Sequence, residues 1–345
     1  MQLDLLAFTP EFIAAVLRDA PFTSELINLI PQYLSGYEEL FWETAVITPY
    51  DARYSDYDIK GVVQTLLMYH RAAAAIDALG YDIKSANIED SLLCTILLEA
   101  PLDKSFGSVR QYSVCRIIQH LQDSDNVDIY TLCSIEYIYL PWLDRYSSTQ
   151  PRAIRYKLAN DADYFCELMK ITYKERHQEA VKKSVPRAVS ERLFQLTFQY
   201  SIVPGTDWEG NFQPDIFTAW ISIVKEWAKE NDRFEVTMHT VGNGLSYARF
   251  DENNIIDEAI MKELNSIENE EIRTGYRLGV FNQRGVHSVD PEVKLERGLA
   301  AKYQQRADAA ERLGYSRFSE LLHSVASGFI SEADYNACHV QEDED

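Results

Sequence analysis

The segment 275–287 brings together the residue types best suited to bind a ligand. It reads GYRLGVFNQRGVH, so glycine, arginine, asparagine and histidine crowd into one expected turn. Glycine permits close backbone approach, and the planar guanidinium of Arg277 or Arg284 can grip a carboxylate or a phosphate. In a competing structural interpretation, Asn282 and Gly285 end a helix and Arg284 binds carbonyl groups at that end. We favour the structural interpretation and keep the segment as a candidate ligand site.

His239 is the second candidate, because Gly242 and Gly244 follow it closely. A glycine pair after a histidine could open a helix N-terminus toward an anion. A dinucleotide-binding loop needs a third glycine where this chain has Tyr247, and it follows a strand, which the sequence does not predict here. We therefore expect no cofactor. An enzyme or small-ligand binder stays open as an alternative, with a site formed by His239, Arg277, Asn282 and Arg284.

Motifs for metal binding and for nucleophilic catalysis are missing. The seven histidines never pair at a spacing of four residues, and neither HExxH nor GxSxG occurs. The five cysteines have no metal-clip or redox spacing, which indicates reduced side chains in the core. The stretch that starts at Asp207 lacks the final glutamate of a calcium loop, so we expect a turn before a helix that begins at Pro214. We predict no metal site and no catalytic residue.

Aromatic residues are concentrated in two stretches, 37–57 and 130–146. Aromatic side chains dominate both protein cores and the hot spots of interfaces. We expect most of them to pack between helices and a subset to be exposed to a protein partner. The candidate interface residues are Trp42, Tyr50, Tyr137 and Trp142.

The apolar residues that must position these side chains recur with helical spacing along nearly the whole chain. In 59–79, those from Val62 to Ile76 fall on one stripe, as in an amphipathic helix. Short polar stretches such as 123–126 and 147–151 mark helix boundaries. Strand patterns are scarce, and no repeat consensus recurs at a fixed interval. The prediction is an all-α fold, an irregular helical-repeat (α-solenoid-like) array of about ten to thirteen helices.

A change in composition near 180–190 indicates a boundary between two helical units. The part before it is acidic and rich in tyrosine, whereas the part after it holds three of the five tryptophans. We expect an N-terminal helical-repeat unit at 1–183, a C-terminal helical unit at 184–338, and a disordered acidic tail at 339–345.

The chain carries 54 acidic and 33 basic side chains, a formal charge of −21. Phosphate contacts need clustered Lys and Arg, so we expect no nucleic-acid partner. The richest basic stretch, 152–192, is interrupted by acidic residues and fits a solvated helix face. The same charge leaves another alternative open, an acidic mimic of DNA that inhibits a nucleic-acid-binding protein. We expect neither a leader segment nor a membrane span, and hence a cytoplasmic protein.

Two stretches, 130–173 and 201–310, resemble the C-terminal helical region of large, mostly uncharacterised bacterial proteins. That group carries a Leu-Glu-x-x-Tyr-Leu-Pro-Leu-Leu-like phrase and later an Asp-x-x-Phe-Phe-like phrase, with counterparts here in IEYIYLPWL at 135–143 and DYFC at 163–166. The group tends to have paired glycines before its Gln-Glu-Arg, where this chain has PEVKLER at 291–297. The resemblance implies a bacterial origin and a helical repeat, and it transfers no catalytic residue.

The leading hypothesis is a non-catalytic helical scaffold that binds another protein. It rests on the helical repetition, the missing motifs and the family resemblance. We extend it to a component of a multi-protein bacterial system, such as one for defence against mobile elements. The sequence specifies neither the partner nor the oligomeric state.

Overall fold

The computed structural model of the chain describes residues 8–47, 58–79, 83, 87–143, 149–176, 186–198, 200–284 and 293–342. These ranges contain 17 α-helices and no β-strand, apart from an isolated bridge between Thr206 and Phe212. The all-α class is therefore confirmed. The expected number of ten to thirteen helices is too low, because some continuous apolar stripes are divided between two helices.

The chain separates into two compact units, residues 1–154 and 155–345, which we call unit 1 and unit 2. The division falls within helix α10 (Arg152–Asn160). The change in composition at 183/184, where we expected a boundary, lies outside the described residues.

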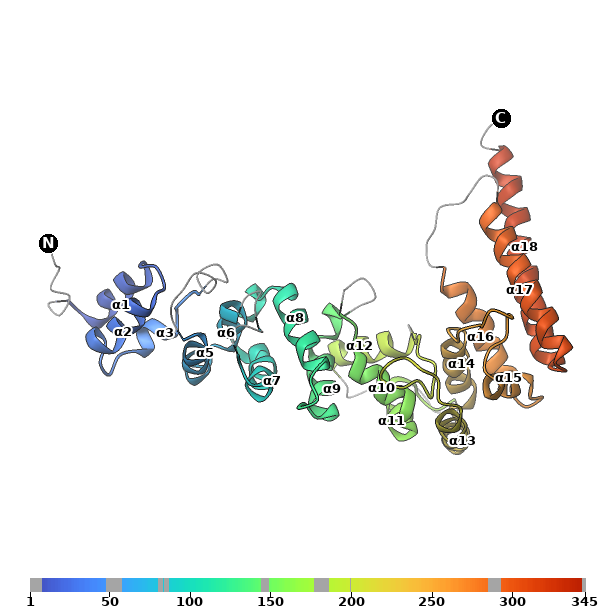
Figure 1. Cartoon of the computed structure of the whole chain (residues 1–345), viewed down its shortest axis with the longest axis horizontal. Helices are drawn as coiled ribbons and strands as arrows, with labels where there is room; N and C mark the ends of the chain where they lie inside the picture. Colours follow the sequence, from blue (N-terminus) through green and yellow to red (C-terminus); the bar gives the residue numbers. More distant parts are fainter. Residues whose placement is uncertain are drawn as a thin grey trace. The chain divides into compact units, whose positions relative to one another are not determined.

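In unit 1, each helix packs mainly against helices one or two positions away in the sequence (Figure 1). Contacts join α1 to α2 and α3, α5 to α6, α6 to α7 and α8, and α9 to α7 and α8. Three short 3-10 turns, at Ala100–Leu102, Phe106–Ser108 and Leu140–Trp142, connect some of these helices. The helices of unit 1 are α1 (Pro10–Arg18), α2 (Ser24–Tyr33), α3 (Glu39–Trp42), α5 (Ile59–Met68), α6 (Ala72–Leu79), α7 (Asp90–Glu99), α8 (Gln111–Gln122) and α9 (Ile129–Ile138).

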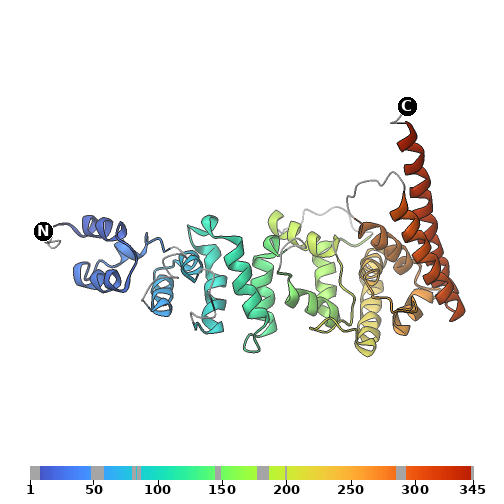
Figure 2. The same cartoon turned by 45° about the horizontal axis from the view of Figure 1, so that its top comes forward.

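In unit 2, the closest helix pairs are α14 with α16 and α17 with α18. The last two form a long antiparallel hairpin in which α18 extends beyond α17 (Figure 2). After α10, the helices of unit 2 are α11 (Ala162–Thr172), α12 (Arg187–Phe198), α13 (Pro214–Glu230), α14 (Phe234–Leu245), α15 (Glu258–Asn265), α16 (Glu270–Asn282), α17 (Lys294–Arg312) and α18 (Ser316–Glu342).

Local capping explains where several helices begin. The side chains of Thr9, Asp58 and Asp128 accept hydrogen bonds from first-turn N–H groups of α1, α5 and α9. Pro10 and Pro214 stand at the start of α1 and α13, where a missing N–H costs no hydrogen bond. The helix start expected at Pro214 is therefore confirmed.

The single helix expected over 59–79 is wrong, because α5 and α6 divide this stretch. His70 adopts a left-handed conformation with φ of 55°. Its N–H donates to the carbonyl of Leu67 (2.9 Å), and the N–H of Arg71 donates to the carbonyl of Leu66 (2.8 Å). This pair of bonds is the Schellman ending of a helix, which stops α5 although the apolar stripe continues.

The C-terminal end of the chain also differs from the expectation. Helix α18 continues to Glu342, so the first four residues of the segment 339–345 are helical. The remaining three, 343–345, lie outside the described residues.

Gly242 and Gly244 lie inside α14 and are buried, so they do not form an anion-binding loop after His239. A Cβ atom added at Gly242 would lie 2.0 Å from the carbonyl oxygen of Ile272 in α16. Gly275 of α16 is equally close to α14, since an added Cβ would lie 2.2 Å from the carbonyl oxygen of His239. The glycines therefore let the two helix backbones touch.

Candidate functional site

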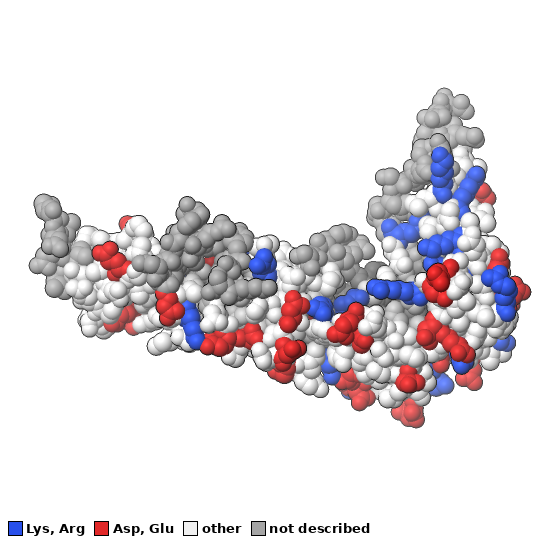
Figure 3. All heavy atoms as spheres, in the orientation of Figure 1, with Lys and Arg blue, Asp and Glu red and all other residues white. Residues whose placement is uncertain are grey.

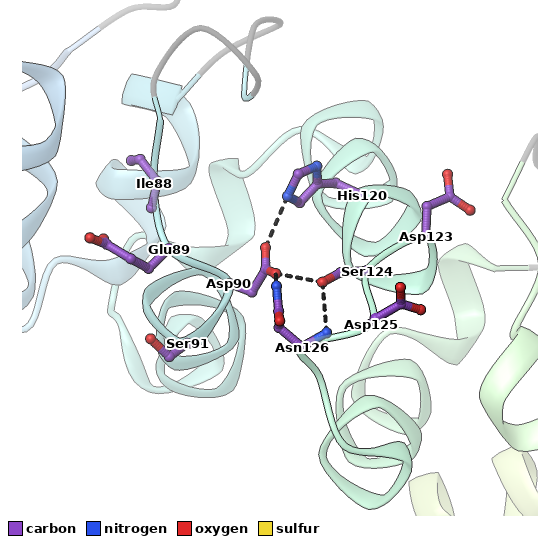
Figure 4. A pocket seen from close by; sticks show the side chains of 9 residues that line it. All are labelled: Ile88, Glu89, Asp90, Ser91, His120, Asp123, Ser124, Asp125 and Asn126. Carbon is purple, nitrogen blue, oxygen red and sulfur yellow. Dashed lines mark hydrogen bonds and ion pairs between the residues drawn. The ribbon is translucent and has the colours of Figure 1, made fainter.

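A hollow of about 860 Å³ opens in unit 1 between the start of α7 and the loop that follows α8 (Figure 4). Asp90 is at its centre. One carboxylate oxygen lies 3.0 Å from Nε2 of His120, and the other accepts hydrogen bonds from Ser124 Oγ (2.5 Å) and Asn126 Nδ2 (3.3 Å). Glu89, Asp123 and Asp125 add further carboxylates to the lining.

The Asp90 hollow contains aspartate, histidine and serine, but their order is not that of a catalytic triad. In a triad the histidine lies between the other two and removes the proton of the serine. Here Ser124 donates to Asp90, so His120 does not contact the hydroxyl (Figure 4). The arrangement joins α7 to the loop 123–126 and does not activate a nucleophile.

The electrostatics of Asp90 agree with this structural role. Burial alone would raise the pKa of its carboxyl, but the hydrogen bonds from Ser124, Asn126 and His120 together hold the pKa below its ordinary value. Asp90 is therefore ionised at neutral pH, when it accepts all three bonds. The sequence marked 123–126 only as a helix boundary and gave no signal for Asp90, because its partners are about thirty residues away.

A second hollow, of about 440 Å³ in unit 2, contains His239. Its Nε2 lies 2.6 Å from a carboxylate oxygen of Glu271, and both side chains are partly exposed. A carboxylate that orients an imidazole is the pairing found in general acid–base catalysis. Tyr173, Phe234 and Val236 give the hollow an apolar part, and none of its described lining residues is serine, threonine or cysteine.

The buried guanidinium of Arg233 fixes one wall of the His239 hollow. It donates to the carbonyl oxygens of Tyr173 (3.0 Å) and Asn231 (2.9 Å) and contacts Glu175 (3.4 Å). Because these bonds tie the end of α13 to the chain after α11, Arg233 has a structural role.

The other three residues of the candidate ligand site lie elsewhere in unit 2. Arg277 lines a separate hollow between α16 and α18, where it donates to Ser324 Oγ (3.3 Å). Asn282 is the exposed last residue of α16. Arg284 contacts the carboxylates of Glu296 (2.6 Å) and Glu332 (2.5 Å), in α17 and α18. Of the four, His239 alone lines the 440 Å³ hollow among the described residues.

The candidate interface residues that the structure describes are buried to different extents. Trp42 is 6% exposed and packs against Phe22 and Phe41, so it belongs to the core. Trp142 is half-buried, and its ring stacks on Phe106 at 5.6 Å between ring centres. Tyr137 is half-buried as well. Tyr50 lies outside the described residues.

Glu136 is a buried carboxylate that the sequence did not single out. It accepts hydrogen bonds from Gln122 Nε2 (2.7 Å) and from the backbone N–H groups of Ala153 (3.0 Å) and Ile154 (2.9 Å). Burial raises its pKa to about 7, although these bonds act in the opposite direction. The stretch 135–143 therefore contains a glutamate that satisfies backbone groups in the core.

Comparison of the chain with protein-family models, with curated proteins and with solved structures found no match. Within the described ranges, no three side chains of His, Cys, Asp or Glu are grouped so that they could hold a metal ion. Among the described helices, none combines the length and apolar character that a bilayer crossing requires.

Proposed function

We propose that this chain is a non-catalytic module that binds another protein, and that α13 provides a contact surface. The observation that carries the proposal is an exposed apolar stripe on this helix. Ile216 and Ile223 are 41% and 48% exposed and lie seven residues apart, on one side of the helix. The half-buried Trp227 extends the stripe by another turn.

Helix α13 is apolar on two sides, and only one of them is covered by its own unit. Phe217, Trp220 and Val224 are almost fully buried against neighbouring helices such as α11 and α14. A helix at a protein surface normally has polar residues opposite its buried face. Full burial of an exposed aliphatic side chain contributes about 1.5–3 kcal/mol, so a partner that covers these half-exposed isoleucines would gain roughly 1 kcal/mol from each.

Two further observations agree with a binding role. The contacts of unit 1 join helices that are near in sequence, which is the pattern of a helical array with a large accessible surface. The Asp90 network binds structural groups together and leaves no activated nucleophile. Membership of a bacterial multi-protein system, cytoplasmic location and the family resemblance remain parts of the proposal.

The test compares capture of partners by three versions of the tagged full-length chain. We expect the wild type to retain a stoichiometric protein partner, the Ile216→Glu/Ile223→Glu variant to lose it, and the Ser222→Glu variant to keep it. Ser222 is exposed on the same helix and controls for added charge. Circular dichroism must show that all three fold alike. Equal capture by all three folded proteins would disprove a role for this stripe.

A second candidate function is small-ligand binding at the His239 hollow, which the His239–Glu271 pair favours. Mass spectrometry of molecules released from the purified protein tests it. A retained small molecule that is lost in His239→Gln, with no protein partner, would support the enzyme or ligand-binder alternative. Capture of a nucleic-acid-binding protein with an affinity that collapses in salt would instead support the DNA-mimic alternative.

A further inference from the structure

Three arginines converge on one hollow of about 350 Å³ in unit 2. Arg273 and Arg277 are one turn apart on α16, and Arg317 is in the first turn of α18. Lys and Arg also gather over α16–α18 on the face shown in Figure 3. The other residues that line the hollow are Glu270, Thr274, Glu320, Leu321 and Ser324.

The three guanidinium groups are held to different extents. Arg273 donates to the carbonyl oxygens of Leu264 (3.2 Å) and Ser266 (2.5 Å), which closes the end of α15 and fixes this side chain. Arg277 contacts a neutral partner, the hydroxyl of Ser324. Arg317 makes no side-chain hydrogen bond or ion pair in the described part of the chain. Arg277 and Arg317 can therefore turn toward a ligand without breaking a bond to the backbone, whereas Arg273 would donate from the part of its guanidinium that does not contact these carbonyls.

None of the three arginines has a carboxylate within ion-pair distance among the described residues. This differs from Arg233 and Arg284 in the same unit, each of which contacts at least one carboxylate. The lining carries three positive and two negative side chains, so the hollow is net positive in a chain of charge −21. Burial lowers the pKa of Arg273, and the charge of Arg317 adds to this effect, while Glu270 and Glu320 oppose it.

We propose that this hollow binds the phosphate group of a small phosphorylated molecule through Arg273, Arg277 and Arg317. Guanidinium groups approaching from two helices can each donate to a different phosphate oxygen. The hydroxyl groups of Thr274 and Ser324 add neutral donors at the same place. A doubly charged oxyanion also offsets the repulsion among three cations better than a single carboxylate does.

The volume of the hollow limits the size of the molecule that carries the phosphate. Small-molecule pockets measure about 300–1,000 Å³, so this hollow is at the lower end of that range. It has room for a compact group beyond the phosphate itself. The site is on α16 and α18, and so it does not depend on the α13 stripe.

The test measures binding of inorganic phosphate, acetate, free phosphoserine and a short phosphoserine peptide to the full-length chain by calorimetry at low ionic strength. We expect phosphate to bind and acetate to bind much more weakly. Arg277→Gln and Arg317→Gln should each weaken phosphate binding by about tenfold or more, because each removes a charge-assisted hydrogen bond. Glu320→Gln should strengthen binding, since it removes a repelling carboxylate.

Arg312→Gln is the matched control, because Arg312 is an exposed arginine on α17 that does not line the hollow. Arg273 is left unchanged, since it closes the end of α15. Tighter binding of free phosphoserine than of the peptide supports a small phosphorylated ligand. The proposal is overturned if the folded wild type does not bind phosphate at millimolar concentration, if acetate binds equally well, if the peptide binds tighter, or if Arg312→Gln weakens binding as much as Arg277→Gln does.

Discussion

Replacing Glu136 by glutamine should remove most of the change in stability of unit 1 between pH 5 and pH 8. The wild-type carboxyl is 0% exposed and has a pKa of about 7 in the folded chain, raised from 4.5 by burial. The folded state therefore binds the proton more tightly than the unfolded state. Its contribution to stability is complete below about pH 4.5 and is lost as the pH rises through about 7.

The expected magnitude follows from the two pKa values of Glu136. A shift of one unit corresponds to about 1.36 kcal/mol, so the unfolding free energy of the wild type should fall by about 2.5 kcal/mol between pH 5 and pH 8. Glutamine does not ionise, so the unfolding free energy of the Glu136→Gln variant should stay nearly constant over this range. Its amide is uncharged, like the protonated acid, and keeps one carbonyl oxygen that can accept from the donors of Gln122, Ala153 and Ile154. The two proteins should therefore be similar at pH 5, with the variant more stable at pH 8.

Urea unfolding followed by circular dichroism measures this difference, and hydrogen exchange of peptides from 111–154 assigns it to unit 1. Glu43→Gln is the matched control, because Glu43 is an exposed glutamate in the same unit. This control should retain the pH dependence of the wild type. The measured quantity is the difference in unfolding free energy between the wild type and Glu136→Gln. If this difference were the same at pH 5 and at pH 8, the three hydrogen bonds would outweigh burial and the reasoning would be refuted.

Three other predictions concern packing and polar contacts. Gly242→Ala should destabilise unit 2 by about 3 kcal/mol in urea unfolding, because its Cβ would overlap the α16 backbone, whereas Gly298→Ala has free space and should stabilise by up to about 1 kcal/mol. Arg284→Ala should cost about 3–5 kcal/mol by the same assay, because it removes a partner of the fully buried Glu296; an unchanged stability would favour a ligand role for Arg284. Ser124→Ala should cost about 1 kcal/mol and speed hydrogen exchange in 123–128, since it removes one bond to the Asp90 carboxylate.

The helical character of the chain was predictable because the apolar period of 3.6 residues is local information. Helix number was not, since the apolar stripe from Val62 to Ile76 runs through the break between α5 and α6. That break depends on the left-handed conformation of His70. Glycine at this position would have marked the helix end, but histidine does not. This break accounts for one of the helices that the expected count missed.

The candidate ligand residues illustrate what one-dimensional spacing cannot show. Gly242 and Gly275 looked like loop residues, yet they are where α14 and α16 touch. Arg277 was singled out for its guanidinium, but its neighbour in the hollow, Arg317, is forty positions away in the sequence. His239 likewise finds Glu271 only through the contact of α14 with α16. In each case the sequence shows the type of residue, whereas the residue that it contacts depends on how the helices pack.

Polar caps from distant parts of the sequence help to hold in place helices that lack a strong local cap. Asp103 accepts a hydrogen bond from the backbone N–H of Ala73 (2.9 Å), at the start of α6, and Asn265 does the same for Arg317 (2.9 Å), at the start of α18. Glu136 performs this task for the first turn of α10. Each cap satisfies N–H groups that the helix itself leaves unpaired, and it also ties these first-turn residues to the segment that supplies the cap. Acidic residues such as Asp103 and Glu136 therefore contribute to the cohesion of unit 1, although their number in the sequence indicated only a solvated, negatively charged surface.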